Sequence, residues 1–247
     1  MLFNRYFFTV DDAIVVILDE CIIWPAWPGD HEFCGPKLYT ETDGHTPMSH
    51  YPEARFLKSA NAHNQFVPDT GIEVAVAGRS NAGKSSAINV IVNRRQFART
   101  SKTPGRTQLV NFFELRDGQR LVDLPGYGFA QVSAAMRRHW GELLTAYFES
   151  RQSLAGLILI VDIRRRLTDF DRRMVAFAES VDLPIHILLT KADKLKKGPA
   201  AAAVLEVKRE LGDRATVQQF SALKRQGEQE AREVLERFLA AARVGPE

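Results

Sequence analysis

The chain has 247 residues, of which 45% are hydrophobic and 26% are charged, a balance typical of a globular protein with one sizeable core. Its longest apolar run near the start, residues 13–18, is far shorter than the ~20 residues of a membrane-spanning helix, so we expect neither a span nor a secretory signal. The two cysteines, Cys21 and Cys34, are too few for a disulfide framework and favour a reducing cytoplasm. With His45 and His50 they could form a zinc site, but the chain has no Cys-x-x-Cys pair.

The net charge of +3 is unevenly distributed along the chain. Residues 1–47 carry two basic and eight acidic residues, whereas residues 48–247 carry 31 basic and 22 acidic residues. This basic excess favours a polyanionic partner such as nucleic acid, although basic side chains often form only a solvated face.

The change in charge coincides with a change in organisation. Residues 1–47 are predicted to be an irregular N-terminal extension, and we interpret Met48, at the point of change, as an alternative start of translation. Residues 48–71 are interpreted as a lead-in segment. The alternating pattern that predicts a folded domain occupies residues 72–247.

Apolar runs of strand length alternate with longer helical patterns from Ile72 onward. The predicted strands are Glu73–Ala77, Leu109–Leu115, Gln119–Asp123, Leu157–Asp162, Pro184–Thr190 and Thr216–Phe220. The predicted helices are Lys84–Asn93, Ala134–Arg151, Asp169–Ser180, Pro199–Leu211 and Glu228–Ala242. This alternation predicts a three-layer α/β fold with a six-stranded, mostly parallel sheet. The hairpin signal Asp117-Gly118 makes Leu109–Leu115 its one antiparallel strand.

A glycine-rich segment lies between the first predicted strand and the first predicted helix. It reads Gly78-Arg79-Ser80-Asn81-Ala82-Gly83-Lys84-Ser85. The spacing Gly-x-x-x-x-Gly-Lys-Ser is typical of a phosphate-binding loop. Lys84 would lie along the β- and γ-phosphates, and the Ser85 hydroxyl would bind Mg²⁺ at the helix N-terminus, which favours anions. The loop by itself does not identify the nucleotide.

Two later segments fit the magnesium ion and the γ-phosphate. Asp123-Leu124-Pro125-Gly126 closes a predicted strand, so its carboxylate can hold the magnesium shell and the Gly126 N–H can meet the γ-phosphate. The polar loop 100–108 would order over that phosphate and offer a threonine hydroxyl to Mg²⁺. By spacing alone, Thr103 and Thr107 are both candidates.

Two segments near the C-terminal end fit a guanine base. Thr190-Lys191-Ala192-Asp193 follows a predicted strand, and its carboxylate can accept hydrogen bonds from guanine N1–H and the 2-amino group, which selects GTP over ATP. The Lys191 stem would pack on the base plane. Thr190 stands where Asn is usual, which predicts a weaker tether to the phosphate loop. Phe220-Ser221-Ala222 can offer a backbone N–H to guanine O6.

These elements, in this order, resemble the GTPases related to translation factors. Residues 78–86, 100–108, 123–128 and 190–193 resemble more closely the EngB (YihA/YsxC) family of bacterial GTPases, and the resemblance extends over residues 50–243. Threonine is normal at position 190 in that family. The resemblance implies one cytoplasmic, Ras-like GTPase domain of the TrmE-Era-EngA-EngB-Septin-like class. It also implies a role in assembly of the large ribosomal subunit and a link to cell division and septation.

The resemblance further implies which residues contact GTP or GDP. They are Gly78, Arg79, Ser80, Asn81, Ala82, Gly83, Lys84, Ser85, Gly105, Arg106, Thr107, Gln108, Leu109, Asp123, Leu124, Pro125, Gly126, Thr190, Lys191, Ala192, Asp193, Phe220, Ser221 and Ala222. It makes Thr107, together with Ser85, the magnesium ligand rather than Thr103. We assign the catalytic contacts to Lys84, Thr107 and Gly126.

Tyr127 stands at the position that is important for GTP hydrolysis in Ras-like enzymes. Ras-like enzymes place at this position the Gln that orients the attacking water. No substitute base occurs in the motifs, so we predict slow intrinsic hydrolysis and a switch whose GTP-bound form binds ribosome precursors. Asn81 suggests a supplement, because related GTPases with Asn here bind a K⁺ ion that acts like an arginine finger. The alternative is an Asn that only stabilises the loop.

Basic clusters near the expected nucleotide site could bind ribosomal RNA phosphates or could be solvated faces. They are Arg137-Arg138, Arg164-Arg165-Arg166, Lys194 with Lys196-Lys197, and Lys224-Arg225. The chain has no heptad pattern, which favours a monomer. Two alternatives stay open: a non-enzymatic, GTP-dependent scaffold at the division site, which Tyr127 allows, and an ATP-using kinase, against which the Asp193 segment argues.

Overall fold

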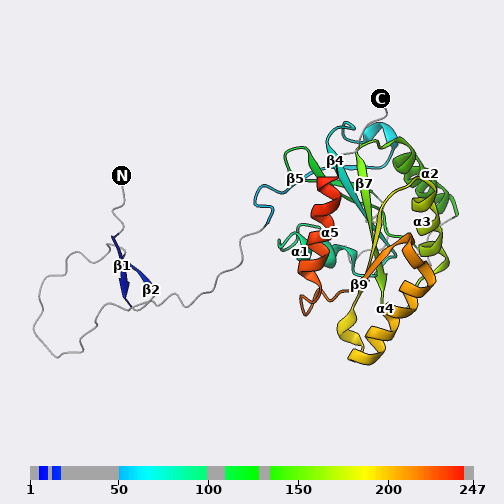
Figure 1. Cartoon of the computed structure of the whole chain (residues 1–247). Coiled ribbons are helices and arrows are strands. Elements are labelled where there is room, and N and C mark those ends of the chain that lie inside the picture. The colour runs from blue at the N-terminus through cyan, green and yellow to red at the C-terminus, as the bar shows by residue number, and fades with distance from the viewer. Residues whose placement is uncertain (1–5, 11–12, 18–49, 99–108, 128–133, 242–247) are drawn as a thin grey trace, which may run out of the picture. The chain divides into compact units, whose positions relative to one another are not determined.

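The computed structural model describes residues 6–10, 13–17, 50–98, 109–127 and 134–241 (Figure 1). Two compact units, residues 1–47 and 48–247, divide the chain. In the first unit, β1 (Tyr6–Val10) and β2 (Ala13–Ile17) pair as antiparallel strands, which the sequence pattern did not predict. All other described elements belong to the second unit.

The second unit contains the alternating strands and helices. Its strands are β3 (Arg55–Ala60), β4 (Ile72–Gly78), β5 (Val110–Arg116), β6 (Gln119–Asp123), β7 (Leu154–Asp162), β8 (Ile185–Thr190) and β9 (Thr216–Gln219). Its helices are α1 (Lys84–Ile91), α2 (Ala134–Ser150), α3 (Asp169–Ser180), α4 (Lys197–Leu211) and α5 (Glu228–Ala240), with short 3₁₀ turns η1 (His63–Gln65), η2 (Ala192–Lys194) and η3 (Gly212–Arg214). Every predicted strand and helix is present, and only element ends differ. For example, α4 begins two residues before Pro199, because proline fits the first turn of a helix.

The sheet has seven strands in the order β3-β5-β6-β4-β7-β8-β9, rather than the predicted six. As the Asp117-Gly118 signal indicated, β5 is antiparallel to β6, and Gly118 has a left-handed φ of 68°. The strand missing from the prediction is β3, which pairs antiparallel with β5 at the sheet edge. Half of its residues are exposed and only Ala60 is buried, so β3 lacks the continuous apolar run by which a central parallel strand is detected.

Helices cover both faces of the sheet, which confirms the three-layer architecture (Figure 1). One hydrophobic cluster joins the sheet to α1 and α5 and includes Leu235, and the other joins it to α2, α3 and α4 and includes Tyr147. Gly156 in β7 lets α5 lie close, because a Cβ at this position would come within 2.4 Å of the Phe238 ring. The core thereby holds the strand ends, where the predicted site lies, in fixed positions.

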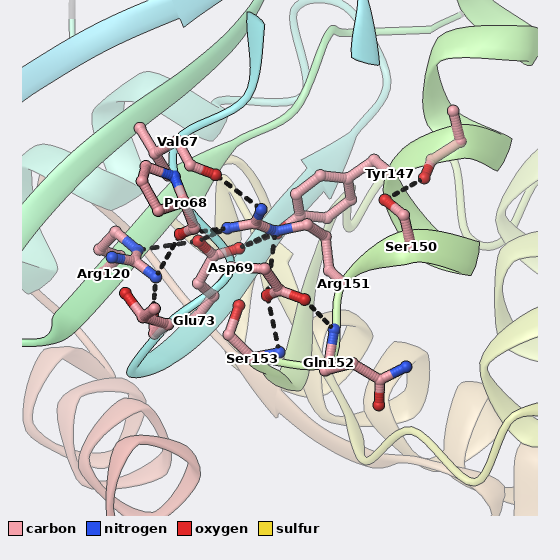
Figure 2. Close-up of polar contacts among 12 residues, drawn as sticks. Val67, Pro68, Asp69, Glu73, Arg120, Tyr147, Ser150, Arg151, Gln152 and Ser153 are labelled. Atoms are coloured by element: carbon pink, nitrogen blue, oxygen red, sulfur yellow. Dashed lines mark hydrogen bonds and ion pairs between the residues drawn. The ribbon is translucent and has the colours of Figure 1, made fainter. Parts of the chain in front are cut away.

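A buried ionic network occupies the opposite end of the sheet, where β4 and β6 begin (Figure 2). The fully buried Glu73 carboxylate accepts hydrogen bonds from Arg120 Nε at 2.8 Å, Arg151 Nε at 3.1 Å and the Tyr147 hydroxyl at 3.2 Å. Two guanidinium groups therefore share one carboxylate out of contact with water.

The same network binds the segment that precedes β4. Arg151 donates to the Val67 carbonyl at 2.8 Å, and Arg120 donates to the Thr70 carbonyl. The Asp69 carboxylate accepts the backbone N–H groups of residues 152 and 153 at 2.8 and 3.0 Å (Figure 2). Residues 67–70 are thus hydrogen-bonded to the connection between α2 and β7.

Among the described helices, none is long and apolar enough to cross a membrane.

Candidate nucleotide-binding site

The predicted phosphate loop joins the end of β4 to the start of α1. Its backbone is left-handed at Asn81 and Gly83, with φ values of 61° and 102°. Glycine adopts this conformation freely, and asparagine is among the few other residues that tolerate it. Since α1 begins at Lys84, the unpaired N–H groups of its first turn and the positive end of its dipole lie at the loop, which favours a bound anion.

The loop meets the end of β6 through an ion pair. The Lys84 ammonium contacts the Asp123 carboxylate, and both side chains are buried, with exposed fractions of 7% and 5%. Asn111 Nδ2 lies 3.5 Å from the other carboxylate oxygen of Asp123. Ser85, the half-buried residue after Lys84, adds a hydroxyl to this part of the site, and such hard oxygen donors suit Mg²⁺.

The end of β8 is tethered to the phosphate loop. The Thr190 hydroxyl lies 2.5 Å from the Ala82 carbonyl oxygen and 3.0 Å from that of Val161. The Lys191 ammonium donates to the Asn81 carbonyl oxygen. The sequence analysis predicted a weaker tether at position 190, because Thr replaces the usual Asn. In the structure Thr190 does connect β8 to the phosphate loop, because its hydroxyl reaches the loop backbone directly.

Replacing Thr190 with Val is expected to weaken GDP binding about threefold to tenfold, because it leaves the buried Ala82 carbonyl without that donor. Thr190→Ser, which keeps a hydroxyl, should bind GDP nearly as the native chain does. Titration with a fluorescent GDP derivative measures both. Equal affinities for the Val and Ser variants would show that the tether does not shape the site.

The predicted base-binding segments also come together. Ser221 Oγ donates to Asp193 Oδ1 at 2.5 Å, and this hydrogen bond lowers the pKa of Asp193. The Asp193 side chain is 9% exposed. Backbone bonds join Ala192 N to the Phe220 carbonyl at 3.1 Å and Phe220 N to the Leu189 carbonyl at 2.8 Å. The carboxylate is thus ionised and held in one orientation. Its second oxygen, Oδ2, lies 3.6 Å from Lys194 Nζ and is the one that can accept from a base.

The Tyr127 side chain contacts two residues of α3. Its hydroxyl donates to the Asp171 carboxylate in the first turn of α3, and its ring stacks on Phe170 with centroids 3.9 Å apart. Burial, followed by the nearby Asp171 charge, raises the pKa of Tyr127 far above its usual value. A neutral, buried phenol that already donates its proton is poorly suited to orient a water molecule.

Sequence reasoning missed Asp162, which ends β7. Its carboxylate binds Arg164 Nη2 at 2.6 Å and Lys191 Nζ at 3.0 Å. Burial raises the pKa of Asp162, but the hydrogen bonds from Arg164 and Lys191 outweigh this and hold the pKa below its usual range. The available signal was an acidic residue that closes an apolar run on a central strand. Asp162 holds the Lys191 side chain beside the phosphate loop.

Other predicted residues are distributed as follows. Gly105, Arg106, Thr107 and Gln108 lie outside the described residues, as do Thr103, Cys21, Cys34 and His45. Leu109 directly precedes β5, and Leu124 and Pro125 follow β6. Gly126 adjoins the phosphate loop, since a Cβ on it would lie 3.5 Å from Ser80. Several strand ends and the start of α1 therefore converge on one site.

A mostly parallel three-layer fold with these motifs at its strand ends defines a GTPase of the phosphate-loop class. A family model described as "50S ribosome-binding GTPase" matches residues 73–191. The probable GTP-binding protein EngB of Hydrogenovibrio crunogenus is 54% identical over 180 residues, which cover 72% of this chain and 85% of that protein. The chain belongs to the EngB family of GTP-binding proteins.

Solved structures share the fold. The crystal structure of a probable GTP-binding protein EngB gives a TM-score of 0.57 at 19% identity and covers 68% of this chain and 98% of that one. The structure of a single-residue variant of Aquifex aeolicus Era bound to GDP.AlF4- gives a TM-score of 0.55 at 16% identity and covers 72% of this chain and 60% of that one.

Proposed function

We propose that this GTPase is a cytoplasmic switch that assists assembly of the large ribosomal subunit and is required for normal cell division and septation. The observation that carries the proposal is the EngB relationship, together with the ribosome-binding description of the matched family model. The basic excess of residues 48–247 supports ribosomal RNA of a subunit precursor as the partner. The chain acts as a monomer.

Each part of the site has a role in this proposal. Asp193, oriented by Ser221, accepts from guanine and selects GTP. Lys84 contacts the β- and γ-phosphates, and the Gly126 N–H meets the γ-phosphate. Ser85 and Thr107 would be the magnesium ligands. When bound, Mg²⁺ neutralises charge that develops on the phosphates.

Intrinsic hydrolysis is slow in this proposal. The slow rate is supported by Tyr127, whose hydroxyl donates a hydrogen bond to Asp171. The residue after Gly126 therefore does not orient the attacking water. The same observation favours a second candidate, a GTP-dependent scaffold at the division site with negligible hydrolysis. The two candidates differ in whether ribosomal particles alter GTP binding or turnover.

Turnover is expected to be several-fold faster in KCl than in NaCl of equal ionic strength, with K⁺ held beside Asn81. The test variant is Asn81→Gly rather than Asn81→Ala, because the φ of 61° at this position would strain alanine but not glycine. Asn81→Gly should hydrolyse GTP equally slowly in both salts. Equal rates for the native chain in the two salts would refute a K⁺ role.

The proposal is tested by measuring affinity and turnover with GTP and ATP, with and without purified large-subunit particles. We expect GTP preference, slow basal turnover and a change in either binding or turnover when particles are added. ATP preference would overturn the assignment of the base-binding residues. GTP binding that is indifferent to particles would favour the scaffold instead.

A further inference from the structure

A pocket of about 360 Å³ borders the phosphate loop, between that loop and the start of α3. Residues 79–82 form one wall, and the end of β7, the start of α3 and Lys191 form the rest. The described lining residues include neither Gly83–Ser85, at which α1 begins, nor Asp193. Residues 79–82 and Lys191 are also predicted nucleotide contacts, so the pocket borders the nucleotide site, but it extends beyond that site to Arg164–Arg166 and the start of α3.

The lining is strongly basic. Its cationic residues are Arg79, Arg164, Arg165, Arg166 and Lys191, and its acidic residues are Asp162 and Asp171. Both carboxylates already have partners, because Asp162 binds Arg164 and Lys191 and Asp171 accepts from Tyr127 and Thr168. The excess of positive charge in a concave site favours an anionic ligand.

The five cations are not equally available. Arg164 is paired with Asp162, as is Lys191, while Arg166 donates to Glu206 at 2.8 Å and to a backbone carbonyl. Within the described parts of the chain, Arg79 and Arg165 have no ion pair or side-chain hydrogen bond, and Arg165 is exposed. A phosphate loop contacts its nucleotide through backbone N–H groups, so the side-chain guanidinium groups of Arg79 and Arg165 are the ones that can take up a second ligand.

We propose that the pocket binds a phosphodiester group of RNA, held by Arg79 and Arg165. This inference rests on the proposed function and names the contact through which RNA meets the GTPase. A guanidinium binds phosphate through two parallel N–H···O bonds, which makes arginine better suited than lysine to such a site. RNA bound here would touch Ser80 and Asn81, so it would lie against the loop that holds the nucleotide.

The test compares Arg165→Glu with Arg173→Glu in the full chain. Arg173 is the matched control, since it is also exposed and lies on α3 but does not line the pocket. The probe is a short fluorescein-labelled RNA hairpin, titrated by anisotropy over a salt series in the presence of a non-hydrolysable GTP analogue. Arg165→Glu should weaken RNA binding roughly tenfold and reduce the log–log salt slope by about one. Arg173→Glu should change neither, and GTP affinity should be native in both.

Several results would overturn the proposal. Equal losses in the two variants would indicate general surface charge, and reduced GTP affinity in Arg165→Glu would assign the pocket to the nucleotide. If the native chain did not bind the RNA hairpin, RNA would be rejected as the ligand of the pocket. If poly-glutamate displaced the labelled hairpin more strongly than unlabelled RNA does, the ligand would instead be an acidic protein. Binding of the native chain to large-subunit particles tests the proposed function separately, so failure there is distinguishable from failure of the pocket.

Discussion

Replacing Asp193 with Asn is expected to lower GTP affinity by about two to three orders of magnitude and to raise affinity for XTP. Two hydrogen bonds from guanine to a carboxylate contribute about 1.5–3 kcal/mol each, and an amide at this position cannot accept both. Xanthine carries a carbonyl where guanine carries its 2-amino group, so the Asn amide can donate to it. The exchange should therefore change which base is bound rather than abolish binding.

The geometry around Asp193 is what makes this effect large. The side chain is 9% exposed, and the Ser221 hydroxyl fixes one carboxylate oxygen at 2.5 Å. A base that fails to pair would leave this poorly solvated carboxylate with the Ser221 hydroxyl and with the Lys194 ammonium 3.6 Å from Oδ2, which costs more than a lost contact in water. Ser221→Ala should have a smaller effect, because the carboxylate remains but loses its fixed orientation.

Titration with fluorescent GTP and XTP derivatives measures the change, with Asp213→Asn as the matched control on an exposed turn. Asp213→Asn should retain native affinity for both nucleotides. If Asp193→Asn kept native preference for GTP, another group would have to read the base, and the assignment of this segment would be wrong.

The sequence predicted the central strands and the segments at their ends better than it predicted the sheet edge, and locality explains the difference. Gly83, Lys84 and Ser85 act through spacing over a few residues, and each motif directly follows an apolar run, so its place at a strand end is readable. The edge strand β3 offers no such signal, since half of its residues are exposed and only one is buried. Its pairing with β5 joins residues far apart in the chain, such as Arg55 and Glu114.

Long-range pairing also decides which charged residues are available for binding. In the sequence, Arg164, Arg165 and Arg166 are three equivalent cations. In the fold, Asp162 binds the first and Glu206 the third, so that of the three only Arg165 has no ion pair among the described residues. Composition therefore indicated a basic surface, but only the contacts identify which side chain is able to bind a phosphate.

Glu73 is the clearest case of a residue whose importance the sequence hides. It lies at the start of a buried strand, where the pattern marks it only as the first residue of an apolar run. Its partners Arg120 and Arg151 lie 47 and 78 residues away. No local pattern predicts that a carboxylate at this position meets two guanidinium groups (Figure 2).

Replacing Glu73 with Gln is expected to lower the free energy of unfolding by about 3–5 kcal/mol, because it leaves two buried guanidinium groups without a counter-charge. The intact pair contributes less than this figure, since burying the ions is itself costly. For a unit of this size, the loss corresponds to a decrease in Tm on the order of 10 °C.

The matched control is Glu210→Gln, which removes the same charge from an exposed ion pair. Glu210 binds Arg172 at 2.7 Å, with side chains 36% and 48% exposed, so its loss should cost less than about 1 kcal/mol. Thermal and urea unfolding of both variants measure the difference. Because the Glu73 network lies at the sheet end opposite the phosphate loop, GTP affinity well below Tm should be native in both variants. Equal stability of the two variants would show that water or a rearranged side chain compensates for the counter-charge that the buried arginines have lost. The network would then position residues 67–70 without contributing strongly to the free energy of folding.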